Sequence, residues 1–184
     1  MSEKKDMLAP SIVLVCICLV ASMLLAATYQ ITKPIIDDLA VKMANESRAE
    51  VLPEADGFTQ LDMDLVDGVT EVYKADNGAG YVVTATFKGF GGPVTVMTGM
   101  DADGVIQNIK VTDASNETPG LGSKTTLPDH TGKFQGISGK ITMDKTSTEG
   151  TYVAPVTGAS YSSKAVFNAV SAALAQFEQI GGSF

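Results

Sequence analysis

The sequence predicts an α+β protein, in which one N-terminal membrane helix precedes a single domain of antiparallel strands closed by a C-terminal helix. Three observations support this class. No charged residue occurs between Met7 and Thr32. Strand-like apolar runs follow one another between residues 69 and 111, and apolar residues then recur at helical spacing near the C-terminus. Strands first and a helix last is the order typical of α+β domains.

The uncharged stretch from Met7 to Thr32 contains 26 residues. As a helix it would be about 39 Å long, against roughly 30 Å of bilayer hydrocarbon. A cleaved signal peptide is the alternative, because Ala26-Ala27 resembles a cleavage region. The apolar core of a signal peptide is only about 7–15 residues long, however. We therefore expect an uncleaved transmembrane helix over residues 7–32.

A second helix is predicted directly after the span. Apolar residues repeat there at helical spacing, namely Ile35, Ile36, Leu39, Ala40 and Met43. Pro34 is tolerated in a first helical turn, and Pro53 would end the pattern. We expect a stalk helix over residues 33–53 and a separate domain over residues 54–184.

The domain begins with four predicted strands. Val69–Lys74 and Tyr81–Phe87 flank a turn-rich segment, and Val94–Met100 and Val105–Val111 flank Asp101-Ala102-Asp103-Gly104, which favours a hairpin. Loops should dominate residues 113–150, with a short strand at Gly139–Met143.

The closing helix is marked by five apolar residues at a spacing of 3.6, which are Val166, Phe167, Val170, Leu174 and Phe177. Ser162 or Ser163 is expected to cap it.

Charge and composition exclude several functions. The net charge is −8, and it arises entirely after the span, where 11 basic residues face 19 acidic ones. Such a chain repels phosphate backbones, so we expect no nucleic-acid binding. Cys16 and Cys18 lie inside the span and are too few for an iron–sulfur cluster within one chain.

No metal site and no catalytic residue are predicted. His130 is the only histidine and has no cysteine partner for a zinc site or a nucleophilic triad, so we expect it on the surface. Asp101 and Asp103 begin a calcium-like spacing, but no glutamate stands at the twelfth position.

Hydroxyl and small residues crowd the segment just before the closing helix, Thr157-Gly158-Ala159-Ser160-Tyr161-Ser162-Ser163. A helix N-terminus offers unpaired backbone N–H groups and the positive end of the helix dipole, and both favour anions. The segment is therefore a candidate phosphate site. By itself, such a segment is far more often an ordinary N-cap than a ligand site.

A second glycine-rich segment supports the interpretation as a ligand site. Its sequence is Glu117-Thr118-Pro119-Gly120-Leu121-Gly122-Ser123-Lys124. With the turn at residues 157–160, it resembles the FMN-binding domain of the G subunit of the Rnf electron-transport complex. It is also similar to the related C subunit of the sodium-pumping NADH:quinone reductase. The glycine-rich run at residues 89–93 matches the same family.

The resemblance implies that FMN is bound and is phosphoester-linked to the last hydroxyl of the turn, here Ser160. It implies that the segment beginning at Glu117 lies against the flavin. The remaining cofactor-binding candidates are Thr157, Gly158, Ala159 and Ser163 for the phosphate, Gly120, Leu121 and Gly122 for the ring, and Glu117, Thr118 and Lys124 for polar contacts. The chain departs from the family at Ser160, usually threonine, and at Ala154, commonly aspartate.

The resemblance also implies a function, a location and partners. It predicts a flavin-carrying electron-transfer subunit of a membrane-bound, ion-translocating ferredoxin:NAD oxidoreductase, without independent catalytic activity. The partners are then the other subunits and, during maturation, a flavin transferase. The N-terminus, residues 1–6, would be cytoplasmic and the domain would lie on the outer face. A membrane-anchored FMN sensor or binding module without electron transfer is the alternative.

Overall fold

The computed structural model describes residues 3–181, with side chains from residue 10 onward. Residues 1 and 2 of the predicted cytoplasmic segment (residues 1–6) and residues 182–184 of the predicted domain therefore lie outside the described range. The described chain divides into two units, residues 1–44 and residues 45–184.

Helix α1 runs without interruption from Glu3 to Val51. Pro34 lies inside this helix, so the prediction that it opens a separate stalk helix is wrong. The helix ends two residues before Pro53, as the sequence suggests. Within the described residues, α1 is the one helix that is long and apolar enough to cross a membrane.

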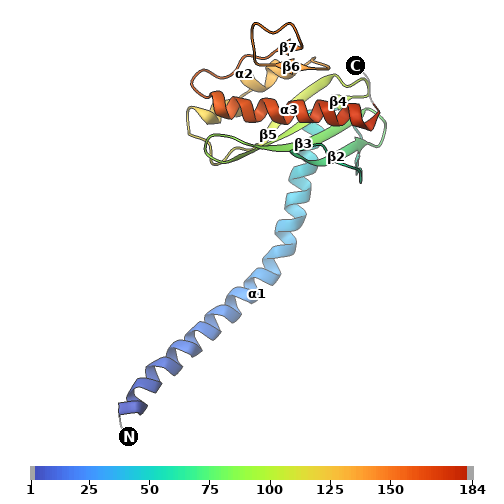
Figure 1. Cartoon of the computed structure of the whole chain (residues 1–184). Coiled ribbons are helices and arrows are strands. Elements are labelled where there is room, and N and C mark those ends of the chain that lie inside the picture. Colours follow the sequence, from blue (N-terminus) through green and yellow to red (C-terminus); the bar gives the residue numbers. More distant parts are fainter. Residues whose placement is uncertain (1–2, 182–184) are drawn as a thin grey trace. The chain divides into compact units, whose positions relative to one another are not determined.

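The second unit is built on an antiparallel sheet whose strands follow one another in chain order (Figure 1). The strands are β1 Phe58–Gln60, β2 Val69–Ala75, β3 Gly80–Lys88, β4 Pro93–Asp101 and β5 Ile106–Asp113. The four predicted strands are confirmed. β1 was not predicted, because its three residues are too few to show an alternating pattern.

The predicted hairpin joins β4 to β5. Gly104 takes a φ of +77°, a conformation that costs little without a side chain. The carboxylate of Asp101 accepts hydrogen bonds from the backbone N–H groups of Asp103 (3.0 Å) and Val105 (2.9 Å). Asp101 and Asp103 therefore shape a turn, and no group of metal-binding side chains is found among the described residues.

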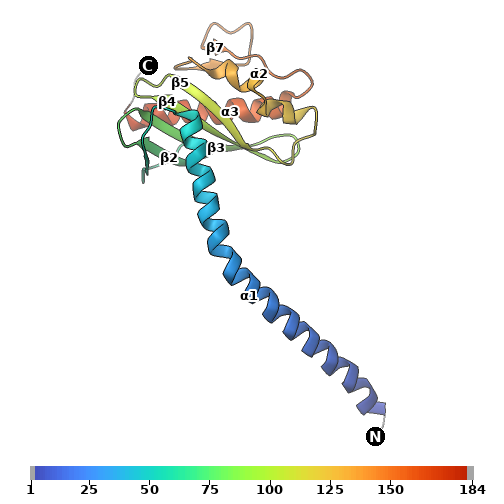
Figure 2. The same ribbon diagram turned by 180° about the vertical axis from the view of Figure 1, so that it is seen from behind.

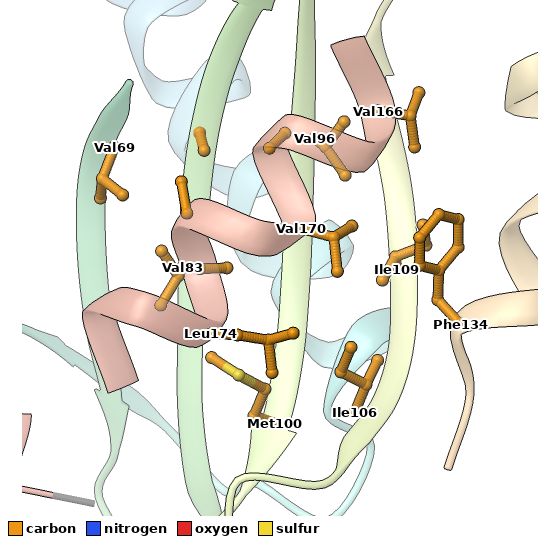
Figure 3. Close-up of a cluster of buried hydrophobic side chains, with 14 of the residues drawn as sticks. Val69, Val83, Val96, Met100, Ile106, Ile109, Phe134, Val166, Val170 and Leu174 are labelled. Atoms are coloured by element: carbon orange, nitrogen blue, oxygen red, sulfur yellow. The ribbon is translucent and has the colours of Figure 1, made fainter. Parts of the chain in front are cut away.

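Helix α3, Ser160–Ile180, lies across one face of the sheet, where it contacts β2, β3 and β4 (Figure 1). Val166 and Val170 are completely buried, and Phe177 is 1% exposed. Figure 3 shows Val166, Val170 and Leu174 of the helix above the sheet residues Val83 and Val96. This layer is the main hydrophobic core.

A second, smaller apolar cluster forms where the end of α1 meets the sheet (Figure 2), and it uses sheet side chains that are not part of the main core. Val51 and Leu52 pack there with Val82 and Met97. Gly99 is needed at this contact, because a Cβ on it would lie 2.2 Å from the carbonyl oxygen of Val51. The last turn of α1 is thus part of the domain.

The segment between β5 and α3 is more ordered than the prediction of loops suggests. It contains two 3-10 helices, η1 Gly122–Thr126 and η2 Gly132–Phe134, and the short helix α2 Pro128–Thr131. The predicted strand near Gly139–Met143 is present as β6, Ile141–Thr142, which pairs in parallel with β7, Thr151–Tyr152.

His130 lies in α2 and is only 3% exposed, so the prediction that it is on the surface is wrong. Its ring meets that of Phe134 edge-on, with centroids 5.7 Å apart. Neither ring nitrogen has a hydrogen-bond partner. Burial, with a smaller contribution from the charge of Lys133, lowers the pKa of His130 from 6.5 to about 4.

Candidate functional site

The N-terminus of α3 forms one wall of the candidate site. The helix starts at Ser160, and Ala159 occupies the N-cap position without a side-chain hydrogen bond. The prediction that Ser162 or Ser163 caps the helix is wrong, because the helix begins before either residue. Both serines are buried and serve tertiary contacts instead.

The hydroxyls of the first turn are therefore not equivalent. The hydroxyl of Ser163 accepts a hydrogen bond from the backbone N–H of Val156 at 2.9 Å. The hydroxyl of Ser162 donates to the carboxylate of Glu117. Ser160 is exposed, at the position where the first backbone N–H groups of α3 have no partner inside the helix. These groups favour an anion next to Ser160.

The second wall is the turn Thr118-Pro119-Gly120-Leu121. The backbone N–H of Leu121 donates to the carbonyl of Thr118 at 3.1 Å, and Gly120 has a φ of +74°. Proline followed by a positive-φ glycine is the pattern of a type II turn. The hydroxyl of Ser123 accepts from the N–H of Gly120 at 2.9 Å, which fixes the turn further.

This turn approaches the first wall through Leu121. A Cβ placed on Gly158 would lie 3.2 Å from the Cδ1 atom of Leu121, so the leucine side chain lies close to the backbone of Gly158. Gly158 also needs its glycine for a φ of +80°. Leu121 stays 42% exposed and offers an apolar surface at the edge of the site.

Two aromatic residues extend this apolar surface. Phe90 lies in the loop between β3 and β4, and Tyr161 lies in the first turn of α3. Their ring centroids are 6.4 Å apart, and each residue is 71% exposed. Side chains of this size are usually more buried in a domain. The sequence prediction did not include them, and their only signal was an aromatic residue within each of the two glycine-containing segments.

The walls enclose a pocket of about 190 Å³. Six residues predicted from the sequence line it, which are Thr118, Leu121, Gly122, Gly158, Ala159 and Ser160. The structure adds Phe90, Tyr161 and Ser162. The other predicted residues lie outside this lining, namely Thr157, Ser163, Glu117, Gly120 and Lys124. We call this space the α3 pocket.

Glu117 lies behind the pocket wall rather than in it. It is 4% exposed, and its carboxylate accepts hydrogen bonds from the backbone N–H of Gly91 (3.1 Å) and the hydroxyl of Ser162. It thus joins the β3–β4 loop, the turn that carries Leu121 and the start of α3. Lys124 is exposed and is not part of the pocket.

The pocket suits a ligand with a phosphate and a flat apolar part. The start of α3 supplies anion-binding N–H groups, and Leu121, Phe90 and Tyr161 supply an apolar surface. The pocket is smaller than the roughly 300–1,000 Å³ of typical ligand sites, and its aromatic residues Phe90 and Tyr161 are largely exposed at its edge. None of the lining residues is acidic, basic or a histidine. The polar side chains of the lining are hydroxyl groups, namely those of Thr118, Ser160, Tyr161 and Ser162.

Comparison with known proteins gives a family match at this site. The family described as FMN-binding domain matches residues 89–175, a range that contains the whole lining of the α3 pocket. Among solved structures, the C subunit of the Na⁺-translocating NADH-quinone reductase from Parabacteroides distasonis is similar, with a TM-score of 0.48 and 24% identity over 63% of each chain.

Two curated relatives extend the match to most of the chain. The G subunit of the Na⁺-translocating ferredoxin:NAD⁺ oxidoreductase complex of Acetobacterium woodii is 33% identical over 92% of this chain and 90% of the relative. The G subunit of the proton-translocating ferredoxin:NAD⁺ oxidoreductase complex of Clostridium ljungdahlii is 29% identical over 90% of this chain and 88% of the relative. With an FMN-binding domain behind a single apolar N-terminal helix, this chain belongs to the family of G subunits of ion-translocating ferredoxin:NAD⁺ oxidoreductase complexes.

Proposed function

We propose that this chain holds FMN at the α3 pocket and serves as the electron-transfer subunit of a membrane-bound, ion-translocating ferredoxin:NAD oxidoreductase complex. One observation carries the proposal. The segments that the family match covers converge on one pocket, where an exposed hydroxyl at a helix N-terminus faces an apolar rim. FMN, when bound, supplies the electron-accepting ring, and the protein supplies its position and surroundings.

Each part of the pocket has a role in this proposal. The first-turn N–H groups of α3 bind the phosphate, and the type II turn holds Thr118 and Leu121 against the ligand. Phe90 and Tyr161, which are largely exposed beside the pocket, would supply apolar contacts for the ring. The absence of acidic and basic side chains from the lining fits a carrier without its own substrate. We accordingly assign no independent catalytic activity to the chain.

We further propose that FMN is attached covalently through its phosphate to Ser160. Of the hydroxyls around the start of α3, those of Ser162 and Ser163 are buried and hydrogen-bonded. Thr157 is exposed but does not line the pocket. Ser160 combines exposure, a place in the lining and proximity to the helix N-terminus, which would stabilise the negative charge of a phosphodiester. A flavin transferase would form the bond from an FMN donor activated as a pyrophosphate diester: the Ser160 oxygen attacks the FMN phosphorus, the hydroxyl proton is lost, the pyrophosphate bond breaks and the nucleoside monophosphate leaves.

The attachment can be tested on the complex purified from its native membrane. Flavin covalently bound to this chain should fluoresce in a denaturing gel and add the mass of FMN to one peptide. Ser160→Ala should remove both signals, whereas Ser160→Thr, which keeps the hydroxyl, should retain them. Thr157→Ala is the matched control from the same turn and should keep the tether.

The outcomes separate the two levels of the proposal. A covalent flavin that survives in Ser160→Ala would move the tether to another residue. Flavin that is present but lost on denaturation of the wild type would leave a noncovalent carrier. A purified complex in which this chain holds no flavin, and another ligand in its place, would favour a binding module over an electron carrier.

The membrane arrangement is part of the same proposal. Helix α1 serves as an uncleaved anchor, with residues 1–6 on the cytoplasmic side, the span at residues 7–32 and the domain of residues 54–184 on the outer face. In intact cells, a membrane-impermeant maleimide should label Ser138→Cys, an exposed domain position. Labelling that requires permeabilised membranes would show that the domain lies on the cytoplasmic face instead.

A further inference from the structure

Glu117 is the one acidic side chain that is buried in the described part of the chain. It is 4% exposed, and both carboxylate oxygens accept hydrogen bonds, one from the Gly91 N–H and one from the Ser162 hydroxyl. Hydrogen bonds from two donors, one at each oxygen, stabilise a carboxylate in a buried position. In its carboxylate form, Glu117 places a negative charge inside the domain.

The neighbouring backbone is shaped around this carboxylate. A Cβ on Gly89 would lie 2.2 Å from its Oε1 atom, and a Cβ on Gly122 would lie 2.4 Å from its Oε2 atom. Glycine at both positions lets the two chain segments close over the carboxylate. A side chain at either glycine would collide with the carboxylate.

No basic side chain balances the charge. None of the ion pairs in the described part of the chain includes Glu117. Of the two cations nearest to it in sequence, Lys110 pairs with Glu50 and Lys124 is exposed. The stabilising groups are the two hydrogen-bond donors and the positive end of α3, since Ser162 lies in its first turn. A buried charge that is balanced only in part acts strongly on its surroundings, because the low interior dielectric screens it weakly.

The Glu117 carboxylate is separated from the α3 pocket by the residues that line it. Ser162 and Gly122 both line the pocket, and both touch Glu117 on their far side. Glu117 itself is not part of the lining. It would not touch a bound cofactor. It would act on the cofactor through the electrostatic field of its charge and by positioning Gly91 and Ser162, to which it is hydrogen-bonded.

We propose that Glu117 is a positioning residue that lowers the reduction potential of the flavin in the α3 pocket. Reduction adds electrons to the ring, and a fixed negative charge close behind the pocket wall disfavours that step. The inference rests on the proposed function, because it requires FMN at this site. It assigns to Glu117 an electrostatic task in place of the direct contact with the cofactor that the sequence suggested.

The test is a redox titration of the purified complex, following the absorbance of the flavin on this subunit. Glu117→Gln keeps the size of the side chain and removes the charge. At the potential where the wild-type flavin is half reduced, the ratio of reduced to oxidised flavin should rise at least tenfold. A tenfold change equals about 59 mV for a one-electron couple and about 30 mV for a two-electron couple.

Two further variants separate charge from geometry. Glu117→Asp keeps the charge on a shorter side chain, so its flavin should titrate within threefold of the wild type even if less flavin is retained. Glu178→Gln removes an exposed carboxylate from the last turns of α3 and should leave the titration unchanged. Equal ratios in Glu117→Gln and the wild type would overturn the inference.

The remaining outcomes are also decisive. A folded Glu117→Gln variant without flavin would overturn the electrostatic role, because Glu117 would then be required for binding. If Glu117→Gln does not fold, the titration of Glu117→Asp is the test. This variant keeps the charge, so a tenfold rise in its ratio of reduced to oxidised flavin would refute a role of the charge. A wild-type chain without flavin would overturn the proposed function itself, whereas flavin in the wild type with an unshifted Glu117→Gln would overturn only this inference.

Discussion

The buried His130 should make the stability of the domain depend on pH in a specific window. In the folded state the pKa of His130 is lowered to about 4, first by burial and second by the charge of Lys133. In the unfolded chain the pKa returns to about 6.5. Between these values the unfolded chain binds the proton and the folded chain does not. The free energy of unfolding should therefore fall as the pH falls below about 6.5.

The size of the effect follows from the two pKa values. Linkage between proton binding and folding gives a loss of about 2 kcal/mol from pH 8 to pH 5. Below pH 4 both states bind the proton, and the loss levels off at about 3 kcal/mol. This is a large fraction of the stability of a domain, which is typically about 5–15 kcal/mol.

Chemical denaturation of the detergent-solubilised chain at pH 8 and pH 5 would measure this loss. His130→Leu is the informative variant, because it removes both unpaired ring nitrogens and keeps an apolar side chain of similar volume. At pH 8 its stability should equal or exceed that of the wild type. From pH 8 to pH 5 it should lose about 2 kcal/mol less than the wild type. Carboxylates titrate in both proteins, so only the difference reports on His130. Equal losses in the two proteins would refute the reasoning.

Four further predictions concern the site, the packing and the membrane helix. Leu121→Asp should alter the absorbance spectrum of the flavin and slow its electron transfer, with little change in unfolding temperature, because the side chain is 42% exposed. Gly122→Ala should lower the free energy of unfolding by about 1–3 kcal/mol, because its Cβ would lie 2.4 Å from the buried Glu117 carboxylate. Gly132→Ala is the control and should have a small effect, because no atom outside the neighbouring residues lies within 4 Å of the position of its Cβ. Arg48→Ala should cost about 1–3 kcal/mol in the same denaturation assay, because the guanidinium lies 3.5 Å from the ring centre of Tyr73 and 3.6 Å from the Glu71 carboxylate. The full-length chain should remain in the membrane fraction after alkaline carbonate washing, and recovery of a soluble chain starting near residue 27 would show a cleaved signal instead.

The sequence determined the elements whose pattern repeats along the chain. The uncharged run from Met7 to Thr32 is long enough to predict a membrane helix, and the apolar runs between Val69 and Val111 are long enough to predict strands. Helix α1 and strands β2 to β5 follow these runs. The closing helix shows the same relation, since Val166, Val170, Leu174 and Phe177 are all buried. Family membership also followed from two local motifs, because each motif is a continuous segment.

Short elements gave no such signal. Strand β1 and the helices η1, α2 and η2 each contain three to five residues, which is too few to show a periodic pattern. Their conformation depends on what they pack against. His130 illustrates this, because its residue type and neighbours in sequence suggested an exposed loop, while α2 places the ring against Phe134.

The pocket itself was decided by the tertiary structure. Phe90 and Tyr161 are 71 positions apart in the sequence (161 − 90), and their rings approach to 6.4 Å only because the β3–β4 loop and the start of α3 meet at the same end of the sheet. Likewise, the sequence placed Glu117 at the cofactor, whereas the fold placed it one layer behind, between Gly91 and Ser162. The physical reason is that periodicity and turn preference act between near neighbours in the chain. Contacts between distant segments are chosen by how complete surfaces pack and by which buried polar groups find partners.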